Sequence, residues 1–251
     1  MMFTIKKSLG QHFLKDESIL QRIMEVLAEN ETKNLLEVGP GGGALTKHLI
    51  QLPGINFKAV ELDDDKIAYL QQTYPSLKDK ILAENFLDID PPFKEPFTVI
   101  GNFPYNISTQ ILFKVLDWKD QVPVVIGMFQ KEVAERAASK EGSKVYGVLS
   151  VLIQAFYEVE YLFDVRSESF SPPPKVQSGV IRLKRKTATL PVKSERAFKV
   201  LVKTAFNQRR KTLRNAVKSL FTTEVLQEDI FNKRAEALSV DDFAALTYKM
   251  S

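Results

Sequence analysis

The chain lacks cysteine altogether, and this absence restricts its chemistry. None of its 251 residues is Cys, and the two histidines are His12 and His48. Without thiols there are no disulfides, no thiolate metal ligands and no cysteine nucleophile. The two histidines lie far apart in the sequence, with no carboxylate pattern beside them, so we expect no metal site. A cysteine-free chain is compatible with a reducing compartment, and we expect a cytoplasmic protein.

Long apolar runs are missing as well. The longest, residues 122–129, has the length of a buried strand and is far too short to cross a membrane. The basic residues 1–10 contain no apolar stretch of the secretory type. We therefore expect no membrane partner. The formal net charge of +4 points only weakly to an anionic partner, so the position of the charges matters more.

Strand-like and helix-like segments alternate along most of the chain. Short apolar runs predict strands at residues 34–38, 57–62, 80–83, 97–100 and 123–129. Apolar residues at helical spacing predict helices at 19–27, 44–52, 64–74, 109–116 and 130–138. This alternation is typical of βαβ units, so we expect an α/β fold with a largely parallel, doubly wound sheet. A further strand pair, 157–165 and 177–184, is expected at one edge.

The character of the sequence changes near residues 184–187. Beyond this point four short helices are predicted, at residues 195–206, 211–220, 223–231 and 240–248. We place a domain boundary there, which gives an α/β domain at 1–186 and a small all-helical domain at 187–251.

A glycine-rich turn follows the first strand, with the pattern Glu37-x-Gly39-x-Gly41-x-Gly43. Such a turn alone is weak evidence, because nucleotides, flavins and S-adenosylmethionine all use one. The spacing matches neither the phosphate-binding loop nor the full dinucleotide fingerprint. It resembles the first motif of S-adenosylmethionine-dependent methyltransferases, which have a Rossmann-like sheet.

The ends of the next strands carry polar residues in a matching order. Glu61 ends the second strand and can accept hydrogen bonds from both ribose hydroxyls. Asn85 follows the third and is placed to meet the adenine edge of the cofactor. Taken singly, each is equally compatible with a solvated strand end or a turn. Their serial order favours a cofactor pocket.

The fourth strand ends in Asn102-Phe103-Pro104-Tyr105. This segment places an amide oxygen, a backbone carbonyl and an aromatic face together at the carboxyl end of a sheet. The two oxygens can accept hydrogen bonds from an exocyclic amine, and the ring can stack on a flat base. The alternative is a proline turn with Tyr105 packed in the core, and the tetrapeptide alone does not decide between them.

Several longer blocks carry a resemblance to a known family. They are residues 7–14 (KSLGQHFL), 37–43, 102–109 (NFPYNIST), 128–136 (MFQKEVAER), 170–178 (FSPPPKVQS) and 205–213 (AFNQRRKTL). Over nearly its whole length the chain resembles the small-subunit ribosomal RNA adenine dimethyltransferases, the kasugamycin-sensitivity enzymes. The resemblance implies dimethylation of N6 on two adjacent adenosines near the 3′ end of small-subunit rRNA, within an immature ribosomal subunit. We also expect a monomer.

By motif position the resemblance implies a set of cofactor contacts. Those residues are His12, Leu14, Gly39, Gly41, Glu61, Asn85 and Asn102. Three positions depart from the family pattern: His12 replaces its usual Asn, Asn85 its usual Asp and Phe103 its usual Leu. His12 and Asn85 can still accept a hydrogen bond, so we expect altered affinity for S-adenosylmethionine rather than lost binding.

A catalytic arrangement follows from the same motif. We expect the Asn102 side-chain oxygen and the Phe103 carbonyl to accept the N6 hydrogens of the target adenine and to aim its lone pair at the methyl group. Pro104 would hold the turn rigid and Tyr105 would stack on the base. Phe170 is a candidate for the second stacking face, although a core position is the commoner fate of phenylalanine.

A basic stretch marks the helical region. Residues 193–218 hold nine Lys and Arg against one Glu, a net charge of +8 that exceeds the +4 of the whole chain. Such a patch is an electrostatic footprint for phosphates, although a single charge run is often just a solvated helix face. The candidate RNA contacts are Lys203, Arg209, Arg210, Lys211 and Arg214. Lys140 and Lys144, in a polar loop, are candidates for further contacts near the target.

Two rival functions remain open at this point. The first is a large-subunit rRNA adenine methyltransferase of the macrolide-resistance type, which shares the cofactor motifs. The second is a ribosome-assembly checkpoint whose binding matters more than its chemistry. The blocks at 170–178 and 205–213 favour the small-subunit enzymes, and the basic helical region makes a DNA adenine methyltransferase the weaker interpretation.

Overall fold

A computed structural model of the chain describes residues 12–251. Of the block predicted at residues 7–14, only the last three residues fall within the described part, and residues 7–11 lie outside it. The main sheet has seven strands in the order β4-β3-β2-β5-β6-β9-β7. Their bounds are β2 Asn34–Val38, β3 Asn56–Val60, β4 Ile81–Leu82, β5 Thr98–Asn102, β6 Val124–Gln130, β7 Tyr157–Val165 and β9 Ser178–Arg185.

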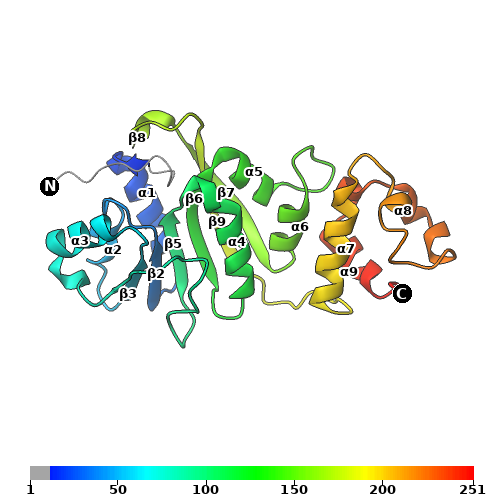
Figure 1. The fold of residues 1–251 in the computed structure, drawn as a ribbon, viewed down its shortest axis with the longest axis horizontal. Helices are drawn as coiled ribbons and strands as arrows, with labels where there is room; N and C mark the ends of the chain where they lie inside the picture. The colour runs from blue at the N-terminus through cyan, green and yellow to red at the C-terminus, as the bar shows by residue number, and fades with distance from the viewer. Residues whose placement is uncertain (1–11) are drawn as a thin grey trace. The chain divides into compact units, whose positions relative to one another are not determined.

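Five of these strands are parallel neighbours. Strands β4, β3, β2, β5 and β6 pair in parallel, and β9 then pairs antiparallel with β6. The predicted Rossmann-like α/β fold is confirmed, and the extra strand pair lies at the β6 side of the parallel strands (Figure 1). Because parallel strands end at one edge, the residues after β2, β3, β4 and β5 gather there, beside the point where the strand order reverses.

Helices precede, connect and follow the parallel strands. They are α1 Glu17–Ala28, α2 Thr46–Leu49, α3 Asp64–Thr73, α4 Ser108–Asp117 and α5 Lys131–Ala138. Asp16 and Asp63 cap α1 and α3 by accepting hydrogen bonds from backbone N–H groups in the first turn. Residues of α1, α2 and α3 share one hydrophobic cluster with β2, β3, β5 and β6. This packing fixes where the strand ends lie.

A second, two-stranded sheet joins distant parts of the sequence. Strand β1, Phe13–Leu14, pairs antiparallel with β8, Phe170–Ser171, so that Leu14 lies opposite Phe170. The Lys15 N–H donates to the Ser169 carbonyl and extends the pairing. Neither strand was predicted, because two residues are too few to display an alternating pattern.

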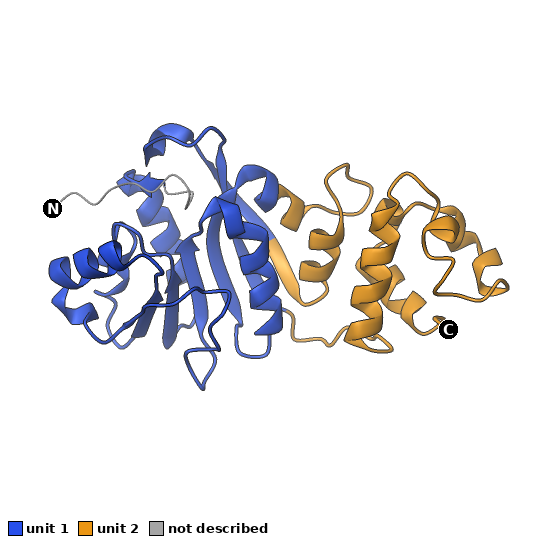
Figure 2. Ribbon diagram, in the orientation of Figure 1, with its two compact units in different colours: residues 1–134, 160–185 blue, residues 135–159, 186–251 orange. Residues whose placement is uncertain are grey.

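The chain divides into two compact units (Figure 2). The first comprises the residues up to 134 together with 160–185, and the second comprises 135–159 and 186–251. The first domain was predicted to end at residue 186, one residue after the last segment of the first unit, but the second unit also takes in residues 135–159. The division into domains at 186 stays a prediction.

The second unit is helical, apart from the start of β7. Its helices are α6 Val148–Gln154, α7 Glu195–Asn207, α8 Leu213–Ala216 and α9 Val240–Thr247, with 3-10 turns at Val225–Gln227, Asp229–Asn232 and Ala235–Ala237. The helix predicted at 223–231 is wrong: Glu228 is extended and splits it into two 3-10 turns. Helix α6 was not predicted. Its face packs against α7, and Tyr146, Phe206 and Phe243 form a run of aromatic contacts in the same unit.

Candidate active site

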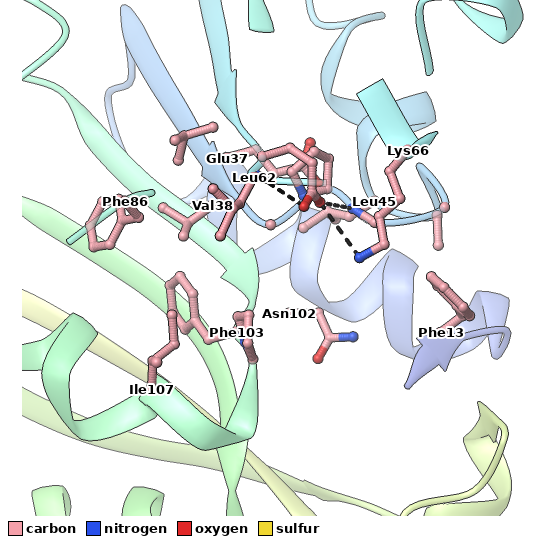
Figure 3. A pocket seen from close by; sticks show the side chains of 18 of the residues that line it. Phe13, Glu37, Val38, Leu45, Leu62, Lys66, Phe86, Asn102, Phe103 and Ile107 are labelled. Carbon is pink, nitrogen blue, oxygen red and sulfur yellow. Dashed lines mark hydrogen bonds and ion pairs between the residues drawn. The ribbon is translucent and has the colours of Figure 1, made fainter. Parts of the chain in front are cut away.

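A cavity of about 250 Å³ opens at the carboxyl ends of the parallel strands (Figure 3). All of its lining residues belong to the first unit. Every cofactor residue predicted from the sequence, from His12 to Asn102, lines it, and so do Phe103, Pro104 and Tyr105. The fold thus brings together residues from five separate segments of the chain at one edge of the sheet.

The glycine-rich turn forms the floor of this cavity. Gly39 and Gly41 have φ of 69° and 57°, in the left-handed region that favours glycine. The Gly39 N–H donates to the Val60 carbonyl over 2.9 Å and thereby ties the turn to β3. A side chain at Gly41 would have its Cβ 3.4 Å from the Phe13 ring. The positive φ values favour glycine at both positions, so the turn presents backbone without side chains to the cavity.

Glu61 is buried at the end of β3 and is held in one orientation. Its carboxylate accepts hydrogen bonds from the backbone N–H groups of Gly41, Leu62 and Asp63, at 3.2, 3.0 and 3.1 Å. The Lys66 amino group lies 3.8 Å from Glu61 Oε2. A fixed carboxylate on the pocket wall is suited to accept hydrogen bonds from ribose hydroxyls. Lys66 lines the cavity too, and the sequence analysis did not single it out.

Glu37 is the second carboxyl group on the pocket wall. Its side chain is buried and accepts a hydrogen bond of 2.8 Å from Thr46 Oγ1. Burial raises the pKa of Glu37 to about 8; the Thr46 hydrogen bond opposes this rise, and the charge of Glu61 adds to it. Near neutral pH the Glu37 carboxyl therefore carries its proton for much of the time.

Asn85 lies on the wall in a compact turn. Its side-chain oxygen accepts from the Leu87 N–H at 3.2 Å, and its amide nitrogen donates to Asp88 at 2.8 Å. An amide oxygen has a second lone pair and an amide nitrogen a second hydrogen, so both ends can still meet an adenine edge. The wall around it is apolar, with Leu62 and Phe86, and suits a flat ring (Figure 3).

Asn102 is oriented by the residue that opens the described chain. Its amide nitrogen donates a hydrogen bond of 3.1 Å to the backbone carbonyl of His12. Because a carbonyl can only accept, the nitrogen must face His12, and Oδ1 is left to face the opposite way. The geometry thus presents the acceptor end of Asn102, which is the end that an amine needs.

His12 is itself fastened to the loop after β8. Its Nδ1 lies 2.9 Å from the Pro172 carbonyl, so Nδ1 carries the proton and a neutral ring keeps Nε2 as an acceptor. The His12 ring lies 5.5 Å from the Tyr105 ring at a tilt of 32°. His12 therefore links the loop after β8 to both Asn102 and Tyr105.

The remaining residues of the motif have distinct surroundings. The Phe103 side chain is buried and packs on Phe129, with ring centroids 4.8 Å apart, and its N–H donates to the Met128 carbonyl. Tyr105 is half-buried, and its hydroxyl is hydrogen-bonded to the Ser178 hydroxyl. Burial raises the pKa of Tyr105. Phe103 anchors the turn from below, so its backbone, not its ring, is available to a ligand.

The donor and acceptor groups of the cavity fit an adenosine-containing cofactor. They offer a fixed carboxylate, an amide beside an apolar wall and an open glycine turn. A family model described as ribosomal RNA adenine dimethylase matches residues 2–249. The chain belongs to the ribosomal RNA adenine dimethylase family. It is an S-adenosylmethionine-dependent methyltransferase, as this family is, and the suspected resemblance is confirmed.

Curated relatives of this dimethylase match along almost its whole length. Ribosomal RNA small subunit methyltransferase A from Cytophaga hutchinsonii is 53% identical over 98% of this chain and 97% of its own. The protein of the same name from Flavobacterium johnsoniae is 53% identical over 98% of this chain and 95% of its own.

Solved structures agree with the fold. A dimethyladenosine transferase from Plasmodium falciparum is 25% identical, with a TM-score of 0.80 over 92% of this chain and 94% of that one. The 23S rRNA methyltransferase ErmE is 22% identical, with a TM-score of 0.71 over 93% of this chain and 99% of that one, and supports the fold alone.

Phe170 of this dimethylase lies outside the cavity. It is 1% exposed, belongs to the hydrophobic cluster of the first unit and lies opposite Leu14 in the β1–β8 pair. In this geometry Phe170 offers no free face to a base, so the stacking role predicted for it is not supported. The phenylalanine instead anchors the small sheet from which His12 reaches the pocket.

The basic residues predicted to hold RNA lie in the second unit and divide into two kinds. Lys203, Arg209, Arg210 and Lys211 are exposed, but Arg209 also makes hydrogen bonds within the unit. Arg209 donates from one guanidinium nitrogen to the Lys144 and Tyr146 carbonyls, at 2.6 and 2.8 Å. Half-buried Arg214 donates to the Leu226 carbonyl at 2.8 Å. Arg209 and Arg214 therefore support the local backbone, which charge counting could not reveal.

Residues 12–251 contain no group of three or more His, Asp or Glu placed to hold a metal ion. No helix among the described residues is both long and apolar enough to cross a membrane.

Proposed function

We propose that this chain dimethylates N6 of two adjacent adenosines near the 3′ end of small-subunit rRNA. The observation that carries the proposal is the orientation of Asn102, whose amide nitrogen is engaged by the His12 carbonyl so that Oδ1 faces away as an acceptor. Relatives at 53% identity bear the name of a small-subunit rRNA methyltransferase, which favours this substrate over large-subunit rRNA.

The task of the protein is to prepare a poor nucleophile. The lone pair of adenine N6 is delocalised into the ring, and hydrogen-bond acceptors on its two hydrogens favour a pyramidal nitrogen. Asn102 Oδ1 and the Phe103 carbonyl are the proposed acceptors. When bound, S-adenosylmethionine supplies an electrophilic methyl group. The two acceptors would hold N6 in line with that methyl group, and water would take the proton that the methylated nitrogen releases.

The position of the base is set by the rest of the motif. The target adenine has to leave its stack to enter the pocket. Tyr105 is the proposed stacking partner, and its hydrogen bond to Ser178 restrains the ring. Pro104 fixes the turn between Phe103 and Tyr105, which in turn fixes the direction of the Phe103 carbonyl.

The proposed cofactor site uses the remaining wall of the cavity. Glu61 would hold the ribose, Asn85 the adenine edge, and the Gly39–Gly41 turn would give room for close backbone approach. His12 would contribute its free Nε2 and Leu14 its place at the rim. Departures from the family pattern at His12 and Asn85 would then tune affinity for the cofactor.

The proposed partner is small-subunit rRNA within an immature ribosomal subunit. The protein would bind it as a monomer in the cytoplasm. Lys203, Arg210 and Lys211 would contact phosphates, since all three are exposed on the basic stretch. Arg209 and Arg214 would also bind phosphate, through the guanidinium N–H groups that their hydrogen bonds to backbone carbonyls do not use.

The test is methyl transfer to defined substrates. Small and large ribosomal subunits that lack adenine dimethylation are each incubated with the protein and S-adenosylmethionine, and mass spectrometry of the rRNA reports the product. We expect dimethyladenosine at two adjacent positions in small-subunit rRNA. Asn102→Ala should lower turnover about 100-fold, the usual cost of losing one oriented acceptor. Asn56→Ala, at the exposed start of β3, is the matched control and should be silent.

Methylation of large subunits alone would refute the substrate assignment. Near-normal turnover of Asn102→Ala would refute the role of Asn102.

A further inference from the structure

A loop beside the motif at residues 102–105 is fastened at both of its ends. It runs from Pro172, after β8, to Ser178, the first residue of β9, and we name it the rim loop. At one end the Pro172 carbonyl accepts a hydrogen bond of 2.9 Å from His12 Nδ1. At the other end the Ser178 hydroxyl is hydrogen-bonded to the Tyr105 hydroxyl. The His12 and Tyr105 rings are 5.5 Å apart and both residues line the cavity, so the rim loop begins and ends beside the cavity.

The middle of the rim loop is exposed on a restrained backbone. Its three consecutive prolines each fix their φ angle, and Pro174 is buried and holds the first half of the loop against the protein. The Lys131 N–H donates to the Gln177 carbonyl over 2.9 Å and holds the second half. Lys175 and Val176 lie between these supports, and both side chains are exposed. The loop therefore presents one cation and one apolar side chain next to the cavity.

The exposure of Val176 coincides with its place in the rim loop. Among the large apolar side chains that the structure describes in the first unit, only Leu62 and Val176 are exposed, at 58% and 45%. Leu62 lines the cofactor cavity. A single exposed valine is ordinary on a protein surface, but this one follows a lysine and stands two positions before the residue that holds Tyr105. Its position points to the strand that carries the target base.

We propose that the rim loop binds the target strand of the rRNA, with Val176 inserted where the extruded adenine leaves its stack and Lys175 on a neighbouring phosphate. An adenine that enters the pocket leaves a gap between its neighbours, and the lost stacking opposes extrusion. An apolar side chain that fills the gap restores contact with those neighbours, as apolar wedges do between unstacked base steps. Lys175 supplies a cation for the backbone of the same strand. This inference rests on the proposed function, from which it takes an rRNA adenine as the target.

The role of Val176 is tested by a change of polarity at constant shape. Val176→Thr replaces one methyl group by a hydroxyl group and should lower kcat/KM on unmethylated small subunits about tenfold, whereas Val176→Ile stays apolar and should keep most of the activity. Isothermal titration calorimetry with S-adenosylhomocysteine should give the wild-type affinity for both variants, because neither change touches the cavity. Thermal melts establish that each variant is folded.

Extrusion of the base can be observed directly. Because the target lies near the 3′ end in the proposed function, a short oligonucleotide with 2-aminopurine at the target position can be ligated to the rRNA before the subunit is reconstituted. Stacking quenches the fluorescence of 2-aminopurine, so extrusion raises it. Wild type with S-adenosylhomocysteine should raise this fluorescence, and Val176→Thr should raise it less.

The role of Lys175 is tested by the salt dependence of binding. Lys175→Met removes the charge and keeps the length of the side chain. It should weaken binding to small subunits and lower the slope of log affinity against log salt concentration by about one, the effect of one lost phosphate contact. Lys33→Met is the matched control, because Lys33 is an exposed lysine just before β2, at the amino ends of the parallel strands. It should leave the affinity and the slope unchanged.

Three results would overturn the inference. Wild-type kcat/KM and fluorescence in Val176→Thr would refute the wedge. A loss of affinity for S-adenosylhomocysteine as large as the loss of kcat/KM would show that the loop acts through His12 instead. An unchanged salt slope in Lys175→Met would refute the phosphate contact. If wild type methylates large subunits and not small ones, the proposed function fails, and the same variants are then compared on large subunits, so the two failures are read separately.

Discussion

Replacing Asn102 by aspartate tests the amide orientation on which the proposed reaction depends. The change is nearly isosteric, but it puts an oxygen where the amide nitrogen donates to the His12 carbonyl at 3.1 Å. An ionised carboxylate then faces a carbonyl oxygen, and two acceptors oppose each other. Losing the hydrogen bond and leaving the carbonyl unpaired costs about 1–3 kcal/mol, which corresponds to roughly 5- to 150-fold in rate if the loss falls on the transition state.

A protonated carboxyl group behaves differently. Its O–H can donate to the His12 carbonyl while its other oxygen accepts from N6, as the amide does. The facing carbonyl raises the pKa of the introduced carboxyl because it disfavours the charged form. Activity of Asn102→Asp relative to wild type should therefore increase as the pH falls.

The assay is kcat/KM on unmethylated small subunits between about pH 5.5 and pH 8.5. The quantity of interest is the ratio of variant to wild type, which removes pH effects common to both proteins. Asn102→Ala is the control: its activity should stay about 100-fold below wild type at every pH, since it has no carboxyl group to protonate. A ratio for Asn102→Asp that is independent of pH would refute the argument that the His12 carbonyl selects the orientation.

Three further predictions concern other parts of the chain. The pKa of Glu37 is about 8 in the folded protein and 4.5 ordinarily, so between these pH values the folded state holds a proton that the unfolded state has lost. The free energy of unfolding of wild type, relative to Glu37→Gln, should therefore fall by a few kcal/mol from pH 5 to pH 8. Urea denaturation measures it. Parallel pH dependence in both proteins would contradict this. Gly127→Ala places a Cβ 2.1 Å from the Phe103 ring, so it should cost about 1–3 kcal/mol of stability and lower the rate of methyl transfer. Unchanged turnover would show that the position of Phe103 does not matter for the reaction. Arg209→Ala removes two hydrogen bonds to backbone carbonyls and should lower the melting temperature. Arg210→Ala should weaken rRNA binding and leave the free energy of unfolding unchanged within about 0.5 kcal/mol. Equal melting temperatures of the two variants would contradict the supporting role of Arg209.

The α/β architecture could be predicted because its strands are short apolar runs with helical stretches between them. Each of the five parallel strands was expected within a few residues of its observed place. The cofactor residues could be predicted for a related reason: parallel strands end at one edge, so polar residues after successive strands are bound to meet. Glu61, Asn85 and Asn102 follow this rule, and all three line the cavity.

What the sequence left out depends on contacts between distant residues. Lys66 has the pattern of a solvated charge in an acidic helix start, and only the fold turns it toward the cavity. Arg209 counted as one more positive charge until its carbonyl partners were known. Phe170 could not be assigned to pocket or core from its neighbours in sequence, because its burial comes from pairing with a strand at residues 13–14.

The pairing of β1 with β8 also determines when, during synthesis, His12 can be held in its place at the cavity. Residues 13–14 are synthesised long before their partners at 170–171. Until then His12 has no Pro172 carbonyl to bind, and the His12 carbonyl that accepts from Asn102 is not held in place. A nascent chain can therefore form its parallel strands before His12 is held at the cavity, and translation past Pro172 supplies the carbonyl that holds it.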